Sequence, residues 1–242
     1  MQISVVKKTF SNANLYRRGY RKDKTLEGDG RSANDPFILS QRMNLSYRII
    51  KRFVDLAISS TSLIVLFPVF AFITLAVRLT SPGPIFYPCK EIGQGGRRFV
   101  YYKFRTMVDH ADKLREQLGD RNEMTGPFFK MKNDPRVTPT GRILRKFSID
   151  ELPQLWSVIK GDMSLIGPRP TQVIEYELLS NWQKQRVCVK PGAVCLWHLQ
   201  GKSGDFDEMV ELDMKYIENW SIWLDITILV RTAWYIMSGK NS

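Results

Sequence analysis

The stretch at residues 56–77, "LAISSTSLIVLFPVFAFITLAV", decides how this chain is organised. It holds 22 residues without a charge. A helix needs about 20 such residues to cross the hydrocarbon core of a bilayer. The alternative is a buried helix of a soluble domain, but such helices are usually shorter and amphipathic. We therefore interpret the segment as a membrane helix.

Pro68 lies near the centre of this segment, where proline deletes a helical hydrogen bond and clashes with the preceding turn. Basic residues flank the segment on both sides: Arg48, Lys51 and Arg52 before it, and Arg78, Lys90, Arg97 and Arg98 after it. Basic flanks favour the cytoplasmic side of a membrane, and here both ends have them. We therefore predict a re-entrant hairpin that bends at Pro68, with a single span as the rival arrangement.

The charge of the chain is concentrated at its N-terminal end. Residues 1–52 contain 12 basic and 4 acidic residues, and so carry +8 of the formal net charge of +12. This excess indicates a polyanionic partner: nucleic acid, an anionic membrane surface or phosphorylated substrates. The arm is polar and contains glycine up to about residue 36, so we predict it to be flexible. It lacks the apolar core and cleavage site of a signal peptide.

Cysteine and histidine are too sparse for a structural metal site. The chain has three widely spaced cysteines, without a C-x-x-C pair, and two histidines. This pattern excludes a disulfide framework or a structural zinc site and fits a reducing cytoplasmic setting.

The residues after the membrane segment predict a β-hairpin. Residues 85–107, "IFYPCKEIGQGGRRFVYYKFRTM", contain two strand-like runs joined by a glycine-rich turn at residues 93–96. This turn lacks the G-x-G-x-x-G pattern and is not a nucleotide fingerprint. We expect a helix at 108–118, a loop at 119–141, a helix after Asp150 and another at about 170–187.

The C-terminal residues predict two amphipathic helices broken near residues 219–221. Their aromatic side chains suit the headgroup region of a membrane: Trp220, Trp223, Trp234 and Tyr235. Altogether we predict an α+β, mainly helical, monotopic membrane protein with a re-entrant helix, a β-hairpin and interfacial amphipathic helices. Its expected parts are the basic arm (1–45), the membrane hairpin (46–80) and a cytoplasmic catalytic domain (81–242).

Two adjacent acids, Asp150 and Glu151, lie in "FSIDELPQLWSVIKGDMSLIGPRP", residues 147–170. Ser148-x-x-Glu151 matches a capping box, but Pro153 would then be the fifth helical residue and lose a hydrogen bond. With Asp150 as the N-cap, Pro153 falls at the third helical position, whose N–H has no intrahelical partner. Capping by Asp150 is therefore our interpretation of these residues alone.

Four motifs in order carry a family resemblance: "YYKFRTM", "FSIDELPQLWSVIKGDMSLIGPRP", "KPGAVCLWHLQGKS" and "ELDMKYIENWSIWLD". Together, from about residue 47 to 238, they resemble the bacterial sugar transferases. These are monotopic phosphoglycosyl transferases that start polysaccharide and glycoconjugate assembly on a polyprenol phosphate. Larger members add membrane spans before this core, so the chain resembles the small form.

The resemblance implies covalent catalysis at the acidic pair. Asp150 matches the nucleophile that attacks the β-phosphate of a UDP-sugar, releases UMP and retains the phosphosugar on its carboxylate. Polyprenol (undecaprenyl) phosphate then accepts the phosphosugar. Glu151 matches the acid associated with Mg²⁺. The implied location is the cytoplasmic face of the bacterial inner membrane. Capping and catalysis by Asp150 are compatible, and we expect both.

Further site residues follow from the same resemblance. Arg105, Arg145 and Arg169 fall where the family places phosphate-binding cations, and arginine forks match phosphate oxygens. Asp225, in "SIWLD", matches a further acid of the site.

The chain departs from the family pattern in two places. Phe67 precedes Pro68 where the family often has serine, so the bend is held differently. Lys202 follows Gly201 where arginine is usual, and His198 stands where glutamine is common. Lys202 is a point charge without a fork, which bears on sugar or nucleotide preference at this substrate contact.

Two rival functions are weighed against the enzyme. The basic arm would suit a membrane-tethered binding protein, but no helix-turn-helix or aromatic nucleic-acid motif is evident, so we expect no nucleic acid partner. The intact Asp150, Glu151 and Arg169 count against a non-catalytic scaffold of a polysaccharide assembly complex. The expected partners are a UDP-sugar, polyprenol phosphate and anionic membrane lipid, and a homo-oligomer is left open.

Overall fold

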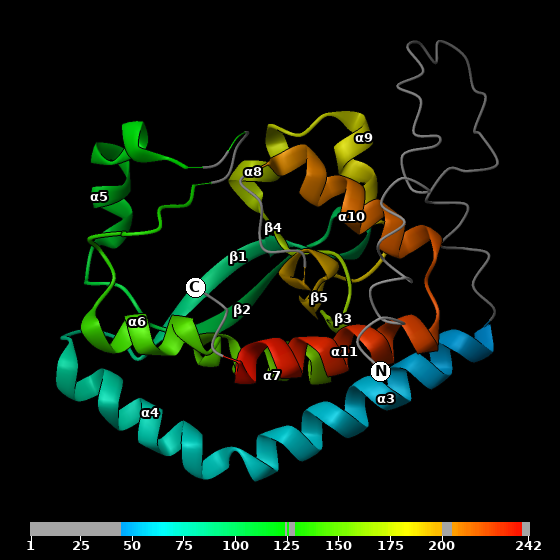
Figure 1. The fold of residues 1–242 in the computed structure, drawn as a ribbon, viewed down its shortest axis with the longest axis horizontal. Coiled ribbons are helices and arrows are strands. Elements are labelled where there is room, and N and C mark those ends of the chain that lie inside the picture. The colour runs from blue at the N-terminus through cyan, green and yellow to red at the C-terminus, as the bar shows by residue number, and fades with distance from the viewer. Residues whose placement is uncertain (1–44, 124, 126–128, 200–204, 239–242) are drawn as a thin grey trace, which may run out of the picture. The chain divides into compact units, whose positions relative to one another are not determined.

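The computed structural model describes residues 45–123, 125, 129–199 and 205–238. Nearly all of the predicted basic arm and Lys202 lie outside the described residues. Within them the fold is α+β and mainly helical, as predicted, with helices around a small sheet (Figure 1).

Two long helices, α3 (Leu45–Val65) and α4 (Phe67–Thr80), form a wide V along one side of the fold (Figure 1). They break at Leu66, and Pro68 lies in the first turn of α4, where its missing N–H costs least. The helix axes bend by 61° here, so the predicted position of the bend is confirmed. In the described part of the chain no single helix is long and apolar enough to cross a membrane, whereas the bent pair together meets that test.

The buried face of α3 is polar. Lys51, Asp55 and Ser59 follow one another at intervals of four, so they form one stripe along the helix, and all three are buried. Lys51 Nζ donates to the carbonyl oxygen of Ile166 over 3.1 Å and pairs with Asp225 Oδ2 over 2.5 Å. These contacts attach α3 to the rest of the fold through charges.

Asp55 makes the second set of contacts along this stripe. Its carboxylate accepts hydrogen bonds from Ser164 Oγ over 2.8 Å and from the N–H of Leu165 over 3.1 Å. Burial raises the pKa of Asp55, although Lys51 and these two donors oppose the rise. The carboxylate of Asp55 is therefore held by hydrogen bonds from Ser164 and Leu165.

The outer faces of α3, α4 and the C-terminal helix α11 (Ile222–Met237) are apolar. Phe53 on α3 is 72% exposed, Phe72 on α4 is 74% exposed and Trp223 on α11 is 76% exposed. Other large apolar side chains that are exposed on these helices are Ile49, Ile64, Val65, Phe67, Leu75, Leu79, Val230 and Trp234. A polar inner stripe with an apolar exterior reverses the pattern of a helix on a soluble domain.

The predicted β-hairpin is confirmed. Strands β1 (Phe86–Ile92) and β2 (Arg98–Phe104) pair antiparallel, with Phe86 opposite Phe104, and the 3₁₀ turn Gln94–Gly96 joins them. A short strand β4 (Thr171–Gln172) adds to β1, giving the order β2-β1-β4. Two further strands, β3 (Ser164–Ile166) and β5 (Gly192–Val194), pair parallel to each other.

The remaining helices are partly those that the sequence predicts. They are α5 (Ala111–Gln117), α6 (Pro139–Lys146), α7 (Gln154–Lys160), α8 (Val173–Glu177), α9 (Asn181–Lys184), α10 (Phe206–Glu218) and α11 (Ile222–Met237). The helix expected at 170–187 is wrong, because the chain there forms β4 and two short helices. Ser180 starts α9 anew, since its side chain accepts from the N–H of Gln183 in a capping box. The C-terminal helix pair α10–α11 is confirmed.

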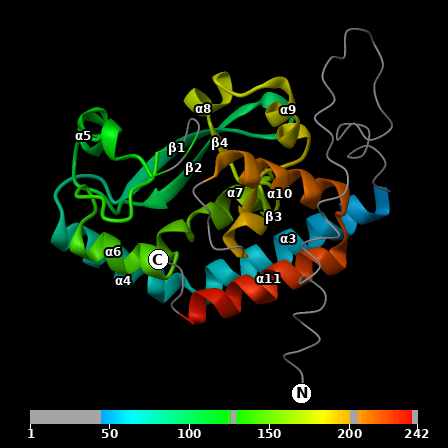
Figure 2. The same ribbon diagram turned by 45° about the horizontal axis from the view of Figure 1, so that its top comes forward.

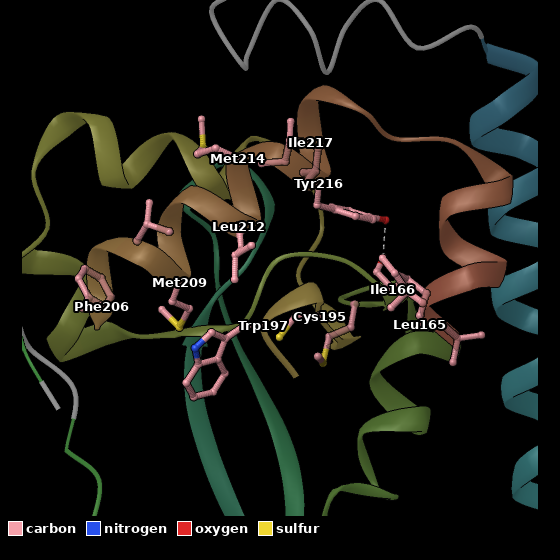
Figure 3. Close-up of a cluster of buried hydrophobic side chains, with 14 of the residues drawn as sticks. Leu165, Ile166, Cys195, Trp197, Phe206, Met209, Leu212, Met214, Tyr216 and Ile217 are labelled. Atoms are coloured by element: carbon pink, nitrogen blue, oxygen red, sulfur yellow. Dashed lines mark hydrogen bonds between the residues drawn. The ribbon is translucent and has the colours of Figure 1, made fainter. Parts of the chain in front are cut away.

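The main core lies beneath α10. Met209, Leu212 and Tyr216 of α10 pack with Trp197 and Ile166, as Figure 3 shows. A smaller cluster joins α4 to the sheet and α6 and consists of Ile73, Val77, Phe104 and Leu144. The helices α3 and α4 are therefore packed onto the rest of the fold by apolar contacts as well as by charges.

Two glycines bring the "GPRP" and "KPGAV" motifs into contact. Gly167 N–H donates to the carbonyl of Val194 over 3.0 Å, and Gly192 N–H donates to the carbonyl of Pro168 over 2.8 Å. A Cβ on Gly192 would stand 2.1 Å from Gly167 N, so no side chain fits there. This close backbone approach fixes the loop that carries Arg169.

Candidate active site

The acidic pair lies in a tight turn that leads into α7. Residues Ile149–Glu151 form a 3₁₀ helix, and α7 begins only at Gln154. The N–H of Leu152 donates to the carbonyl of Ile149, so the chain keeps the tighter 3₁₀ pattern past Pro153, which has no N–H. The predicted capping of this helix by Asp150 is wrong, because the N-cap of α7 is Pro153 and no side chain caps it.

Ser148, just before the pair, has a left-handed backbone with φ of 51°. An L-residue in this region costs about 1–2 kcal/mol, so the surrounding packing must hold it there. The reversal at Ser148 lets α6 end and the acid-bearing turn begin within two residues. It sets the direction in which Asp150 and Glu151 enter the site.

Lys103 of β2 contacts the acidic pair directly. Its Nζ lies 2.6 Å from Glu151 Oε1, and both side chains are half-buried. Burial opposes the ionisation of Glu151, but the charges of Lys103, His198 and Arg169 outweigh it and hold its pKa at about 2. Glu151 is therefore ionised at any physiological pH.

Asp150 behaves differently from its neighbour. It is 8% exposed, and burial, followed by the charge of Glu151, raises its pKa to about 6. Lys103 and Arg145 oppose this rise. The two adjacent carboxyl groups thus have pKa values pushed apart by their surroundings, which is a common property of acids with distinct roles in one site.

Arg145 is positioned by the packing of α6. Thr138 caps this helix, since its side chain accepts from the N–H of Gly141 over 2.9 Å. Gly141 lies against the backbone of Thr106, where a Cβ would stand 2.1 Å from the carbonyl oxygen. One turn later, Arg145 Nε donates to Thr106 Oγ1 over 2.9 Å. The charge of Arg145 acts on Asp150 from this position.

Arg169 is held through its backbone by a buried ion pair. Arg186 and Asp213, each 1% exposed, pair with one another. Arg186 Nη2 donates to the carbonyl of Arg169 over 2.8 Å, and the N–H of Arg169 donates to Asp213 Oδ1 over 3.3 Å. The guanidinium of Arg169 lies 5.3 Å from the ring centre of Trp197 and acts on Glu151 electrostatically.

The other predicted site residues lie elsewhere. Arg105 is buried and donates to the carbonyls of Ser81 and Pro82, both over 2.6 Å, at the end of α4. Asp225 is paired with Lys51. The structure does not bring these two residues into the described contacts of the acidic pair, so their roles in substrate binding stay predictions. Lys202 falls outside the described residues.

The acidic pair can supply oxygen ligands for a metal. The described residues contain no group of three or more His, Cys, Asp or Glu that could hold an ion. Glu151 Oε1 accepts from Lys103, while Oε2 and the adjacent Asp150 carboxylate remain as hard oxygen donors. Mg²⁺ commonly binds through one or two carboxylates, water and substrate phosphates. The pair fits an ion that arrives with a diphosphate.

Sequence reasoning missed four residues of this arrangement: Lys103, Arg186, His198 as a neighbour of Glu151, and Asp213. Lys103 had a usable signal, because it follows the buried Tyr101 by two residues and so lies on the same side of the strand. Arg186 and Asp213 had no such signal in the sequence, because their ion pair forms only when distant segments of the chain come together.

A carboxylate pair surrounded by lysine and arginine defines a centre for an anionic substrate. Residues 46–239 match the sequence profile described as bacterial sugar transferase. The match covers most of the chain, and the chain belongs to the bacterial sugar transferase family.

Curated relatives agree with this assignment. Galactosyl transferase CpsE of Streptococcus agalactiae is 43% identical over 199 residues, covering 81% of this chain and 44% of CpsE. UDP-glucose:undecaprenyl-phosphate glucose-1-phosphate transferase of Xanthomonas campestris is 36% identical over 206 residues, covering 80% and 40%. Exopolysaccharide production protein ExoY of Rhizobium meliloti is 35% identical over 220 residues, covering 88% and 97%. The chain thus spans less than half of the first two relatives and nearly all of ExoY.

The buried ion pair behind Arg169 yields a stability prediction. Asp213→Asn should lower the free energy of unfolding by about 3–5 kcal/mol, because it leaves the buried Arg186 charge without a counter-charge. Glu177→Gln is the matched control, since Glu177 pairs with Arg98 on the surface and the same change should cost less than about 1 kcal/mol. Thermal or denaturant unfolding in detergent measures both. Equal losses would contradict the assigned role of Asp213.

Proposed function

We propose that this protein is a phosphoglycosyl transferase that moves a sugar-1-phosphate from a UDP-sugar to undecaprenyl phosphate and releases UMP. The observation that carries the proposal is the geometry of the acidic pair, in which Lys103 is paired with Glu151 and the adjacent Asp150 is buried. The pKa of Asp150 is raised by this burial, whereas Lys103 lowers the pKa of Glu151. The printed name of the Xanthomonas campestris relative supports the donor and acceptor classes, since it includes both UDP-glucose and undecaprenyl phosphate.

In the first proposed step the ionised Asp150 carboxylate attacks the phosphorus atom that bears the sugar. The bond from this phosphorus to the bridging oxygen breaks, UMP leaves with that oxygen, and an aspartyl phosphosugar forms. A buried carboxylate with a pKa of about 6 is still mainly ionised at neutral pH and is more basic than an exposed one. The positive charges of Arg145 and Arg169 act on Asp150 and Glu151 respectively, and they would attract the diphosphate to the acidic pair.

In the second proposed step a phosphate oxygen of undecaprenyl phosphate attacks the same phosphorus atom. The acyl-phosphate bond breaks, the Asp150 carboxylate is restored, and an undecaprenyl-diphosphate sugar leaves. A Mg²⁺ bound at Glu151 would supply additional neutralisation of the diphosphate. Lys103 pairs with Glu151, lowers its pKa and keeps it ionised.

We also propose that α3 and α4 form a re-entrant hairpin in the cytoplasmic leaflet of the inner membrane. The exposed apolar faces of α3, α4 and α11 support this location, and Figure 2 shows α11 lying alongside α3. The V opens toward the rest of the fold (Figure 1), and a bend of 61° would let the chain return to the face from which it entered. The site would then bind a UDP-sugar donor from the cytoplasm.

Asp150→Asn should abolish UMP release, because an amide cannot form the acyl-phosphate. Activity is measured as UMP released from a panel of UDP-sugars with undecaprenyl phosphate in detergent. Thermal unfolding controls for the fold. Retention of more than a few per cent of wild-type activity would refute the role of Asp150 as nucleophile. A folded wild-type protein that releases no UMP from any donor would favour a non-catalytic scaffold.

Glu151→Gln should also be severely impaired in UMP release, even at raised Mg²⁺.

The pH dependence of the first step tests the pairing of Lys103 with Glu151. Single-turnover UMP release without acceptor should fall as the pH drops through about 6, because protonation removes the Asp150 nucleophile. Lys103→Gln removes a charge that lowers the pKa values of both acids. The acid limb of the pH profile, where UMP release falls, should therefore move to higher pH. Lys113→Gln, on exposed α5, is the control and should leave the limb in place. If the acid limb of Lys103→Gln stays at the wild-type pH, Lys103 does not lower the pKa values of the two acids as proposed.

Cysteine labelling tests the hairpin. In a variant lacking Cys89, Cys188 and Cys195, single cysteines at position 44 and in place of the exposed Thr80 should both resist an impermeant thiol reagent in intact cells. Both should label after the cells are opened. Pro68→Leu restores a helical hydrogen bond and should favour a straight span that exposes position 44. Labelling of position 44 in intact cells with Pro68 present would show that the protein is bitopic.

A further inference from the structure

A cavity of about 250 Å³ lies beside the N-terminal half of α3 and has no role in the proposed reaction. We call it the α3 entry cavity; its lining includes Arg48, Lys51, Arg52, Lys190 and Trp220. None of these side chains contacts Asp150 or Glu151 in the described part of the chain. Four of the five are cations, so the cavity is suited to an anion.

Lys51 and Arg52 are already used by the fold. Lys51 is paired with Asp225 and donates to the carbonyl of Ile166. Arg52 donates to the carbonyls of Val158 and Ile159, at the C-terminal end of α7, over 2.6 and 2.7 Å. The hydrogen bonds from Arg52 satisfy carbonyl groups at the C-terminal end of α7. The contacts of Lys51 and of Arg52 hold the two side chains in the cavity wall.

Lys190 is not satisfied in this way. Its ammonium makes no hydrogen bond or ion pair with any residue that the structure describes. The nearby Asp162 is paired with Lys160 over 3.0 Å, and Asp55, the acid in the cavity wall, is held by Ser164 and Leu165. Burial, followed by the charge of Arg52, lowers the pKa of Lys190.

The charged ends of Arg52 and Lys190 also lie near the same point of the backbone. Arg52 Nη2 and Lys190 Nζ lie 3.4 and 3.6 Å from the point where a Cβ on Gly161 would stand. Two half-buried cations in one wall favour a bound anion, which would relieve their repulsion and accept hydrogen bonds from the ammonium.

The surroundings of the cavity indicate what carries this anion. Tyr216 and Trp220 line the cavity with Ile166 and Val189, so one part of the wall is aromatic and apolar. Exposed apolar side chains of α3 flank Arg48, with Tyr47 before it and Ile49 after it. A ligand that combines an anion with apolar chains matches both features, as at the headgroup level of a membrane.

We propose that the α3 entry cavity binds the phosphate group of an anionic membrane phospholipid, with Lys190 as its principal donor. The proposal rests on the membrane location proposed above. It makes the lipid a fixed ligand at the point where the chain enters the membrane, separate from the acceptor phosphate that must reach Asp150. It gives Lys190 a role outside the transfer reaction.

The test uses the full chain in neutral detergent, titrated with phosphatidylglycerol and followed by native mass spectrometry. Wild type should retain one molecule of phosphatidylglycerol in preference to phosphatidylcholine. Lys190→Gln should weaken this binding by about tenfold, as expected for the loss of one charge-assisted hydrogen bond, and Lys190→Arg should restore it. Lys113→Gln, an equal change of charge on exposed α5, should alter binding by less than about twofold.

Three outcomes would overturn the proposal. Equal losses in Lys190→Gln and Lys113→Gln would show general attraction by charge. Failure of Lys190→Arg to restore binding, with the thermal unfolding of all variants unchanged, would remove Lys190 as the donor. Displacement of the lipid by millimolar inorganic phosphate or glycerol phosphate would show a site for soluble phosphate.

The same samples separate this inference from the proposed enzyme activity. Lys190→Gln should release UMP in detergent at the wild-type rate, because Lys190 lies outside the acidic centre. A wild-type chain that retains phosphatidylglycerol selectively but releases no UMP would refute the transferase and support the lipid site. Active wild-type protein without selective lipid retention would refute the lipid site and support the transferase.

Discussion

The polar stripe on α3 is the contact on which the other parts depend. A helix with an apolar exterior must satisfy its polar groups on its inner side, since buried unpaired charges are costly. Lys51 and Asp55 do so on β3, by bonding Ile166, Ser164 and Leu165. Because β3 runs directly into Gly167 and Arg169, the contacts that hold α3 also set the position of a site residue.

Several local features were predictable because their causes are local. Proline in the apolar segment fixed the bend near residue 68, and glycines at 93–96 fixed the hairpin. The acidic pair was found through its motif. The broken segment at 170–187 and the 3₁₀ entry to α7 were missed, since apolar spacing does not show where Ser180 or Pro153 redirects the backbone.

What the sequence could not show depends on contacts between distant segments. Arg186 and Asp213 look like ordinary surface charges in the sequence, and only the fold buries them together behind Arg169. The pairing of β3 with β5 likewise needs Gly167 and Gly192 to meet, although each glycine alone is compatible with many turns. The positions of Arg105 and Asp225 also follow from tertiary contacts rather than from their motifs.

The separation of the pKa values of the two acids has a simple electrostatic consequence for the proposed reaction. Two adjacent carboxylates without a cation would share a proton near neutral pH, and the nucleophile would be lost for part of the time. Lys103 prevents this by pairing with Glu151 and lowering its pKa, whereas burial keeps the pKa of Asp150 raised. Asp150 then stays ionised at neutral pH and gains basicity from its burial. In the proposed reaction, an incoming diphosphate would meet the charges of Arg145 and Arg169 that act on the two acids.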